Sequence, residues 1–284
     1  MSLEARVREL MGRGGRLSRR WPRYEERGAQ VALAGDIAGT LERGGVRLAE
    51  APTGIGKSLA YLLPGVLAVL EGDRRVVVAT CTRSLQDQLI ERDLPALLEA
   101  LEVQVPFARL KGKQNYLCPR SLELAEGRGA EETEALDALA RWAAADPEGD
   151  LDRFPPADPE AFRRVRGRVA TDPAACTIAT CGRGRECFWV RARRQAAQAR
   201  LLVVNHALLA LSGEVEGLVP DFDVLVVDEA HRLEGVLVAQ LERSVSRHRV
   251  EELLRMVGSG RGGGRGVAAG EPGARGARGG GLLA

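Results

Sequence analysis

The chain has 284 residues with a net charge of +2; 45% of its residues are hydrophobic, but only 4% are aromatic. This length allows one large or two small domains with an aliphatic core, and the near-neutral charge alone implies no partner. The charged N-terminus lacks the apolar core of a secretory signal, and no run of about 18 apolar residues could span a membrane, so we expect a cytoplasmic protein.

The first half of the chain predicts alternating helices and strands. After a basic, weakly patterned segment (1–22), helices are expected at 24–41, 58–70 and 84–101, the last containing Pro95. Strands are expected at 46–49 and 75–80, and the second is a continuous apolar run typical of a strand buried on both faces. Two later apolar runs, 201–204 and 224–227, extend the pattern. Such alternation predicts a parallel, doubly wound α/β sheet.

Residues 51–58 (Ala-Pro-Thr-Gly-Ile-Gly-Lys-Ser) join a predicted strand to a predicted helix. Gly54 and Gly56 permit the dihedrals that point backbone amides at phosphate oxygens. Lys57 would reach the β- and γ-phosphates, and the Ser58 hydroxyl would ligate Mg²⁺ at the N-terminus of the helix. Ala51 stands where the usual pattern has a glycine, but the strand–loop–helix context still predicts a nucleotide site.

Asp228 and Glu229 follow the last apolar run, in the sequence Asp-Glu-Ala-His. Carboxylates at the C-terminal end of a parallel strand face the ligand crevice. We expect Asp228 to hold Mg²⁺ and Glu229 to orient and deprotonate an attacking water. The predicted catalytic residues are therefore Lys57, Asp228 and Glu229.

Four cysteines, Cys118, Cys176, Cys181 and Cys187, lie in the segment 111–200 that interrupts the α/β alternation. Clustered cysteines in a cytosolic protein favour a metal over a disulfide. The spacing lacks the close Cys-x2-Cys pairs of most zinc sites and favours a four-iron cluster; zinc and unliganded thiols stay open. Cys81, at a predicted strand end, is expected to be a packed residue.

The charges of this inserted segment are unevenly distributed. Residues 121–150 are acidic, whereas residues 160–200 hold ten arginines. An arginine-rich block is either a solvated face or a surface for a polyanion, and both readings stay open. From Gly258 onward, 12 of 27 residues are glycine, and this tail is expected to be disordered.

These features divide the chain into expected parts: a basic N-terminal segment (1–22), two portions of one motor domain (23–110 and 201–257), a largely helical insertion (111–200) and a disordered Gly/Arg-rich tail (258–284). Seven motifs follow one another along them: Arg27–Gln30, Glu50–Ser58, Thr80–Gln88, Lys111–Cys118, the three-cysteine run (Cys176, Cys181 and Cys187), Val203–Leu209 and Asp228–His231.

This order resembles the iron–sulphur DNA helicases of superfamily 2, the XPD and DinG-like group, and the bacterial DinG-like branch most. The resemblance implies a RecA-like P-loop NTPase sheet with an inserted [4Fe-4S] domain, and ATP-dependent 5′-to-3′ unwinding. It implies ATP, Mg²⁺ and the cluster as cofactors, and single-stranded or forked duplex DNA as the partner of a monomer. Gln30 would read adenine, Thr82 and Gln88 would touch the single strand, and His231 would couple hydrolysis to movement. The implied nucleotide site comprises Gln30, Thr53, Gly54, Ile55, Gly56, Lys57, Ser58 and Asp228.

Members of this group continue with a second RecA-like domain that carries an arginine finger, and the resemblance fades near Met256. We therefore expect the tail to reflect a frameshift or truncation, with an evolved RNA-binding tail as the alternative. The expected activity is weak ATP binding with slow turnover and no unwinding. An ATP- and DNA-binding iron–sulphur module without motor activity is the alternative function, and a redox protein regulated by nucleotide has less support.

Overall fold

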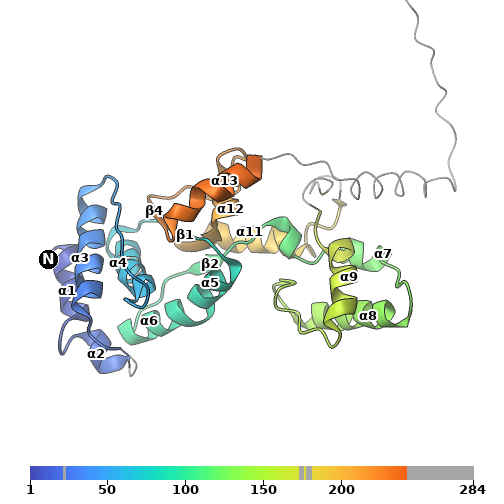
Figure 1. Cartoon of the computed structure of the whole chain (residues 1–284), viewed down its shortest axis with the longest axis horizontal. Helices are drawn as coiled ribbons and strands as arrows, with labels where there is room; N and C mark the ends of the chain where they lie inside the picture. The colour runs from blue at the N-terminus through green and yellow to red at the C-terminus, as the bar shows by residue number, and fades with distance from the viewer. Residues whose placement is uncertain (22–23, 173–175, 177–180, 242–284) are drawn as a thin grey trace, which may run out of the picture. The chain divides into compact units, whose positions relative to one another are not determined.

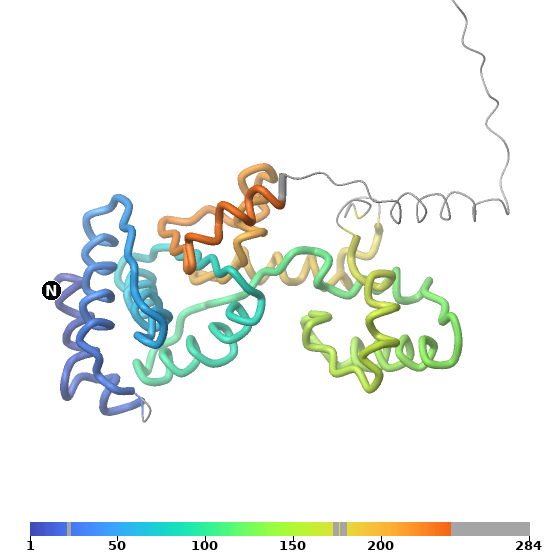
Figure 2. Tube along the Cα trace, viewed as in Figure 1, coloured from blue at the N-terminus to red at the C-terminus, as the bar shows by residue number. Residues whose placement is uncertain are grey.

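A four-stranded parallel sheet forms the centre of the structure, a computed structural model that describes residues 1–21, 24–172, 176 and 181–241. The strand order is β2-β3-β1-β4, so segments far apart in sequence are neighbours, as the colours of Figure 2 show. The predicted parallel α/β architecture is therefore confirmed. The strands are β1 (Val76–Thr80), β2 (Phe107–Arg109), β3 (Leu201–Asn205) and β4 (Val224–Val227).

The central strand β1 is buried along its whole length because both faces of the sheet are covered. Val76 and Val78 belong to one hydrophobic cluster, whereas Val77 and Ala79 belong to the other. This alternation follows from the two-residue period of a strand. The apolar runs that predicted β1, β3 and β4 thus reflect burial on both faces.

Helices from the N-terminal part of the chain supply the first cluster, and α1, α3 and α4 are successive neighbours (Figure 1). The expectation of a weakly patterned segment at 1–22 misses two helices here. Leu3, Val7, Leu10 and Met11 are buried, at the spacing of one helical face. The helices are α1 (Leu3–Met11), α2 (Arg16–Arg20), α3 (Gly28–Arg43), α4 (Lys57–Gly72) and α6 (Leu94–Leu101).

The helix predicted at 84–101 is interrupted by a π-helical turn. α5 (Arg83–Gln88) passes into η1 (Leu89–Asp93) before α6 begins. Pro95 has no backbone N–H and its ring crowds the carbonyl four residues earlier, which favours a local change in the helical hydrogen-bond pattern here. The wider turn also lets Gln88 Nε2 donate to Asp93 Oδ2 at 2.9 Å.

The inserted segment is largely helical and shares the second hydrophobic cluster with the sheet. Trp189 and Ala196 of α11 belong to that cluster together with Leu202 and Val204 of β3. The inserted segment is therefore anchored on the parallel sheet, and its described residues share a core with that sheet. Its elements are η2 (Lys113–Asn115), α7 (Pro119–Leu124), α8 (Ala130–Ala145), α9 (Pro159–Val169) and α11 (Phe188–Gln198).

One predicted strand is wrong. Residues 46–49 form no strand, and the side chains of Val46 and Leu48 are exposed. A strand needs a hydrogen-bonded neighbour, and the four described strands pair only with one another. The tail predicted to be disordered, 258–284, lies outside the described residues.

The described chain closes with α12 (His206–Ser212), η3 (Ala230–Arg232) and α13 (Leu233–Leu241). A search of the described helices finds none with the length and apolarity needed to cross a bilayer.

Candidate nucleotide and metal sites

The glycine loop has the backbone that its sequence predicts. Gly54 has φ +82° and Gly56 has φ +87°, both in the left-handed region that favours glycine. Gly56 is needed for space as well, because a Cβ there would lie 2.1 Å from the side-chain nitrogen of Gln30. The loop ends at Lys57, the first residue of α4, so the N-terminus of this helix points at the loop.

Two side chains from the start of α3 hold this loop in place. Gln30 is 5% exposed, and its Nε2 donates to the Gly56 carbonyl at 2.8 Å. The Arg27 guanidinium donates to the Gly54 carbonyl. Gln30 therefore lies at the nucleotide site, with its amide nitrogen engaged by the loop, and its role in reading adenine stays a prediction. Sequence reasoning assigned no role to Arg27.

Lys57 and Glu229 meet although 172 residues separate them. Lys57 Nζ lies 2.8 Å from Glu229 Oε1. This hydrogen bond raises the pKa of Lys57 and lowers the pKa of Glu229. Partial burial acts against both shifts, but its effect is smaller. Both groups are thus charged at neutral pH, and an incoming γ-phosphate would compete with Glu229 for the lysine.

The turn after β4 is strained at Glu229. Its φ is +53°, a conformation that costs a residue with a Cβ free energy and that recurs at functional sites. His231 Nδ1 lies 3.6 Å from Glu229 Oε2, but the imidazole is 69% exposed. The coupling role expected of His231 stays a prediction.

Asp228 is buried and held by several donors. Its Oδ2 accepts from the Tyr61 hydroxyl at 3.2 Å, and its Oδ1 accepts from the Glu229 amide at 2.9 Å. His206 Nε2 lies 2.8 Å from the Asp228 carbonyl oxygen, and this imidazole is fully buried. Sequence reasoning gave no individual role to Tyr61 or His206. Tyr61 follows Ser58 by three residues on a predicted helix, and this spacing could have indicated that the two side chains face the same region.

Thr82 and Gln88 are expected to touch single-stranded DNA. Thr82 follows β1 and precedes α5, and Gln88 is the last residue of α5. Thr82 is exposed and caps α5, since its hydroxyl accepts from the Leu85 amide at 3.2 Å. Gln88 is half-buried and donates to Asp93. The DNA contacts of both residues stay predictions.

The four insertion cysteines are half-buried free thiols. Burial raises the pKa of the Cys176 thiol. The positive charge of Lys113 lowers this pKa, whereas the other three cysteines of the group, Cys187, Cys118 and Cys181, raise it further. The other three cysteines therefore lie within electrostatic range of Cys176. Within the described residues, however, no group of three or more His, Cys, Asp or Glu side chains is placed to hold a metal ion.

Two of these cysteines sit at the starts of helices. Cys118 precedes α7 and Cys187 precedes α11, where the helix dipole favours negative charge. Cys81 is separate from the group, and its sulfur lies 3.9 Å from the Arg232 guanidinium.

Most of the arginine-rich block pairs with acidic groups of the chain itself. Arg164 and Arg168 of α9 contact Glu132 of α8 at 3.5 and 2.6 Å. Six of the ten arginines pair with carboxylates, and two more, Arg191 and Arg193, donate to backbone carbonyls. Over the described ranges, Arg185 and Arg194 alone in this block make neither contact. Of the two interpretations of the arginine-rich block, the structure thus favours a solvated face for most of this surface, because the chain's own carboxylates neutralise most of the arginines.

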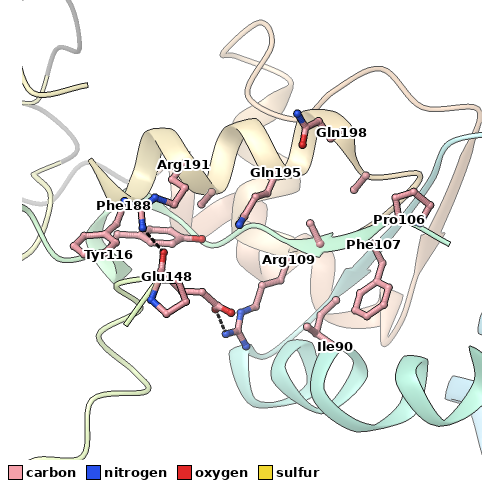
Figure 3. A pocket seen from close by; sticks show the side chains of 14 residues that line it. Ile90, Pro106, Phe107, Arg109, Tyr116, Glu148, Phe188, Arg191, Gln195 and Gln198 are labelled. Atoms are coloured by element: carbon pink, nitrogen blue, oxygen red, sulfur yellow. Dashed lines mark hydrogen bonds and ion pairs between the residues drawn. The ribbon is translucent and has the colours of Figure 1, made fainter. Parts of the chain in front are cut away.

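A buried ionic network joins the inserted segment to the part of the chain around the parallel sheet. The Lys111 side chain is fully buried, and its Nζ lies 2.7 Å from Asp150, 3.0 Å from Asp87 and 3.4 Å from Asp152. Arg109 at the end of β2 extends the network and pairs with Glu148 (Figure 3).

A pocket of about 350 Å³ opens beside this network, along β2 and α11 (Figure 3). Arg109, Glu148 and Arg191 line it together with apolar side chains such as Phe107 and Phe188. No residue of the nucleotide site lines this pocket.

Comparison with known proteins adds the family context. Residues 36–122, which include the glycine loop, match the family described as DEAD/DEAH box helicase. The ATP-dependent helicase DinG of Mycobacterium tuberculosis (strain ATCC 25177 / H37Ra) is 36% identical over 258 residues, covering 81% of this chain and 38% of that protein. The ATP-dependent DNA helicase DinG of Escherichia coli (strain K12) is 33% identical over 247 residues, covering 78% of this chain and 34% of that protein.

The chain thus spans less than two fifths of the length of these curated relatives. The resemblance to DinG-like helicases, inferred from the order of the motifs, is confirmed.

Proposed function

We propose that this chain is the nucleotide-binding motor portion of a DinG-like, ATP-dependent DNA helicase. The convergence of Lys57 and Ser58 at the start of α4 with Asp228 and Glu229 after β4 is the observation that carries the proposal. Two motifs 172 residues apart are brought within hydrogen-bonding distance, which is the arrangement that nucleotide hydrolysis requires. An isolated Asp-Glu turn would not need to face a phosphate loop.

Each residue of the site has a role in this proposal. The amides around Gly54 and Gly56 would cradle the phosphates, and Lys57 would leave Glu229 to bind the β- and γ-phosphates. The freed Glu229 carboxylate would then orient the attacking water and accept its proton. Ser58 and Asp228 would hold Mg²⁺, which when bound neutralises charge on the phosphate oxygens.

Replacing Lys57 with alanine should weaken the binding of a fluorescent ATP analogue about tenfold or more, because a charge-assisted hydrogen bond to phosphate is lost. The equivalent change at Arg163, an exposed residue of α9 paired with Glu160, should leave the affinity unchanged. Binding that is equal in wild type and Lys57→Ala would contradict the proposal. Melting curves recorded beside each titration separate a lost contact from a misfolded chain.

The proposal includes a [4Fe-4S] cluster held by Cys118, Cys176, Cys181 and Cys187. The donor set supports it, because all four residues are half-buried free thiols. Four thiolates suit an iron–sulphur cluster and also zinc. Bound there, the cluster would tie the starts of α7 and α11 to the segment around Cys176 and Cys181 through iron–sulfur bonds.

Single-stranded DNA is the proposed partner. The arginines of the 160–200 block that have no partner within the described chain indicate where on this surface it would bind. Six of the ten arginines of the 160–200 block pair with carboxylates. Among its described residues, Arg185 and Arg194 have neither a carboxylate nor a carbonyl partner, so they are the candidates to meet phosphate. Each backbone contact made by a cation releases counterions, which makes binding depend on salt.

The double variant Arg185→Ala/Arg194→Ala should therefore bind single-stranded DNA more weakly and lower the slope of log affinity against log salt by about 1.4. Fluorescence anisotropy at a series of salt concentrations measures both quantities. Arg163→Ala should retain the wild-type slope, since that arginine already pairs with Glu160. A double variant with the wild-type slope would place the DNA elsewhere on the surface.

A further inference from the structure

Tyr61 carries a buried hydroxyl to which the proposed mechanism gives no role. It lies on α4, three residues after Ser58, and is 5% exposed. Residues at this spacing lie on the same side of a helix, so Tyr61 and Ser58 face the same region. The Tyr61 hydroxyl donates to Asp228 Oδ2 at 3.2 Å and so bridges α4 to the end of β4.

The direction of this hydrogen bond follows from the groups that make it. A phenol hydroxyl has one proton to donate, and its acceptor here is the Asp228 carboxylate oxygen. Tyr61 is therefore the donor in this contact.

The contacts of Asp228 fix the rotation of its carboxylate. One oxygen accepts from Tyr61 and the other accepts from the Glu229 amide. Because each carboxylate oxygen has two lone pairs, one remains on each oxygen for a cation. Over the described part of the chain, Tyr61 provides the one side-chain hydrogen bond to this carboxylate.

We infer that Tyr61 is a positioning residue for the divalent cation that accompanies the nucleotide. Its hydroxyl joins α4, which carries Ser58 three residues earlier, to Asp228 after β4, and it holds the Asp228 carboxylate in one rotation. This inference rests on the proposed nucleotide site. Partners that orient metal ligands in this way commonly change metal affinity about tenfold or more when they are removed.

The test compares the magnesium dependence of nucleotide binding in wild type and Tyr61→Phe, using the full chain and a fluorescent ATP analogue. Tyr61→Phe should keep the affinity measured without Mg²⁺ and should need about tenfold more Mg²⁺ to reach half of the metal-dependent gain. Manganese binding in the presence of ATP, followed by electron paramagnetic resonance, should show the same shift without any turnover. The phenylalanine ring preserves the packing in the buried site.

Tyr24→Phe is the matched control, because its hydroxyl donates to the Met11 carbonyl, and neither Tyr24 nor Met11 belongs to the nucleotide site. It should retain the wild-type magnesium midpoint. An unchanged midpoint in Tyr61→Phe would overturn the inference, and so would an equal loss of affinity with and without Mg²⁺, which indicates packing alone. If wild type binds no nucleotide, the proposed function fails first and the inference falls with it.

Discussion

Replacing Lys111 with methionine should lower the free energy of unfolding by about 3–5 kcal/mol, the usual cost of removing one partner from a buried ion pair. The Lys111 side chain is fully buried among Asp87, Asp150 and Asp152, and Asp150 is itself almost fully buried. Methionine fills a similar volume but leaves these carboxylates without their central cation. Urea unfolding measures the loss from the shift in midpoint at constant slope.

Two further variants test whether the loss of stability comes from charge that is buried. Arg163→Met removes a cation from an exposed pair with Glu160 and should change stability by less than about 1 kcal/mol. Adding Asp150→Asn to Lys111→Met should recover part of the loss, since one uncompensated charge is removed with it. A Lys111→Met loss under about 1 kcal/mol would show that water reaches these carboxylates.

Replacing Cys118 with serine should abolish the brown colour and the bound iron and sulfide expected of the wild-type chain purified without oxygen. A four-iron cluster needs a thiolate for each iron, and a serine hydroxyl is a poor substitute at neutral pH. Visible absorbance with iron and sulfide analysis gives the readout. The expected loss is close to complete because one corner of the cluster would lack its ligand.

Cys81→Ser is the matched control, because Cys81 lies at the end of β1 beside Arg232, apart from the other cysteines. That variant should keep full colour and iron content. A colourless wild-type chain with one zinc per molecule would instead identify a structural zinc site. Wild-type protein with neither metal, prepared without oxygen, would leave the thiols unliganded and contradict both metal assignments.

Local sequence patterns accounted for the elements that position the nucleotide site. Apolar runs placed β1, β3 and β4 because strands of a parallel sheet are buried on both faces. Glycines placed the left-handed turns at Gly54 and Gly56, since few other residues adopt that backbone.

The misses came where local patterns are weak or misleading. β2 spans three residues, too few to show a period, and residues 46–49 have an apolar pattern but no described neighbouring strand with which to pair. The N-terminal helix α1 did carry a helical pattern, at Leu3, Val7 and Leu10, but its basic residues obscured it, and α2 has too few residues to show a period.

What the sequence indicated by itself is the candidate chemistry of this protein: a predicted phosphate loop, a carboxylate pair and four thiols. The loop, the pair and three of the thiols are each specified by residues close together in the chain. Only the tertiary structure decided which of these groups meet. It paired Lys57 with Glu229, placed the Tyr61 hydroxyl on Asp228 and buried Lys111 among three aspartates. It also neutralised most of the arginine-rich block, which the sequence left open between a solvated face and a DNA surface. The reason is physical: charges act through space over a few ångströms, and the partners of Lys57 and Lys111 lie 24 to 172 residues away along the chain.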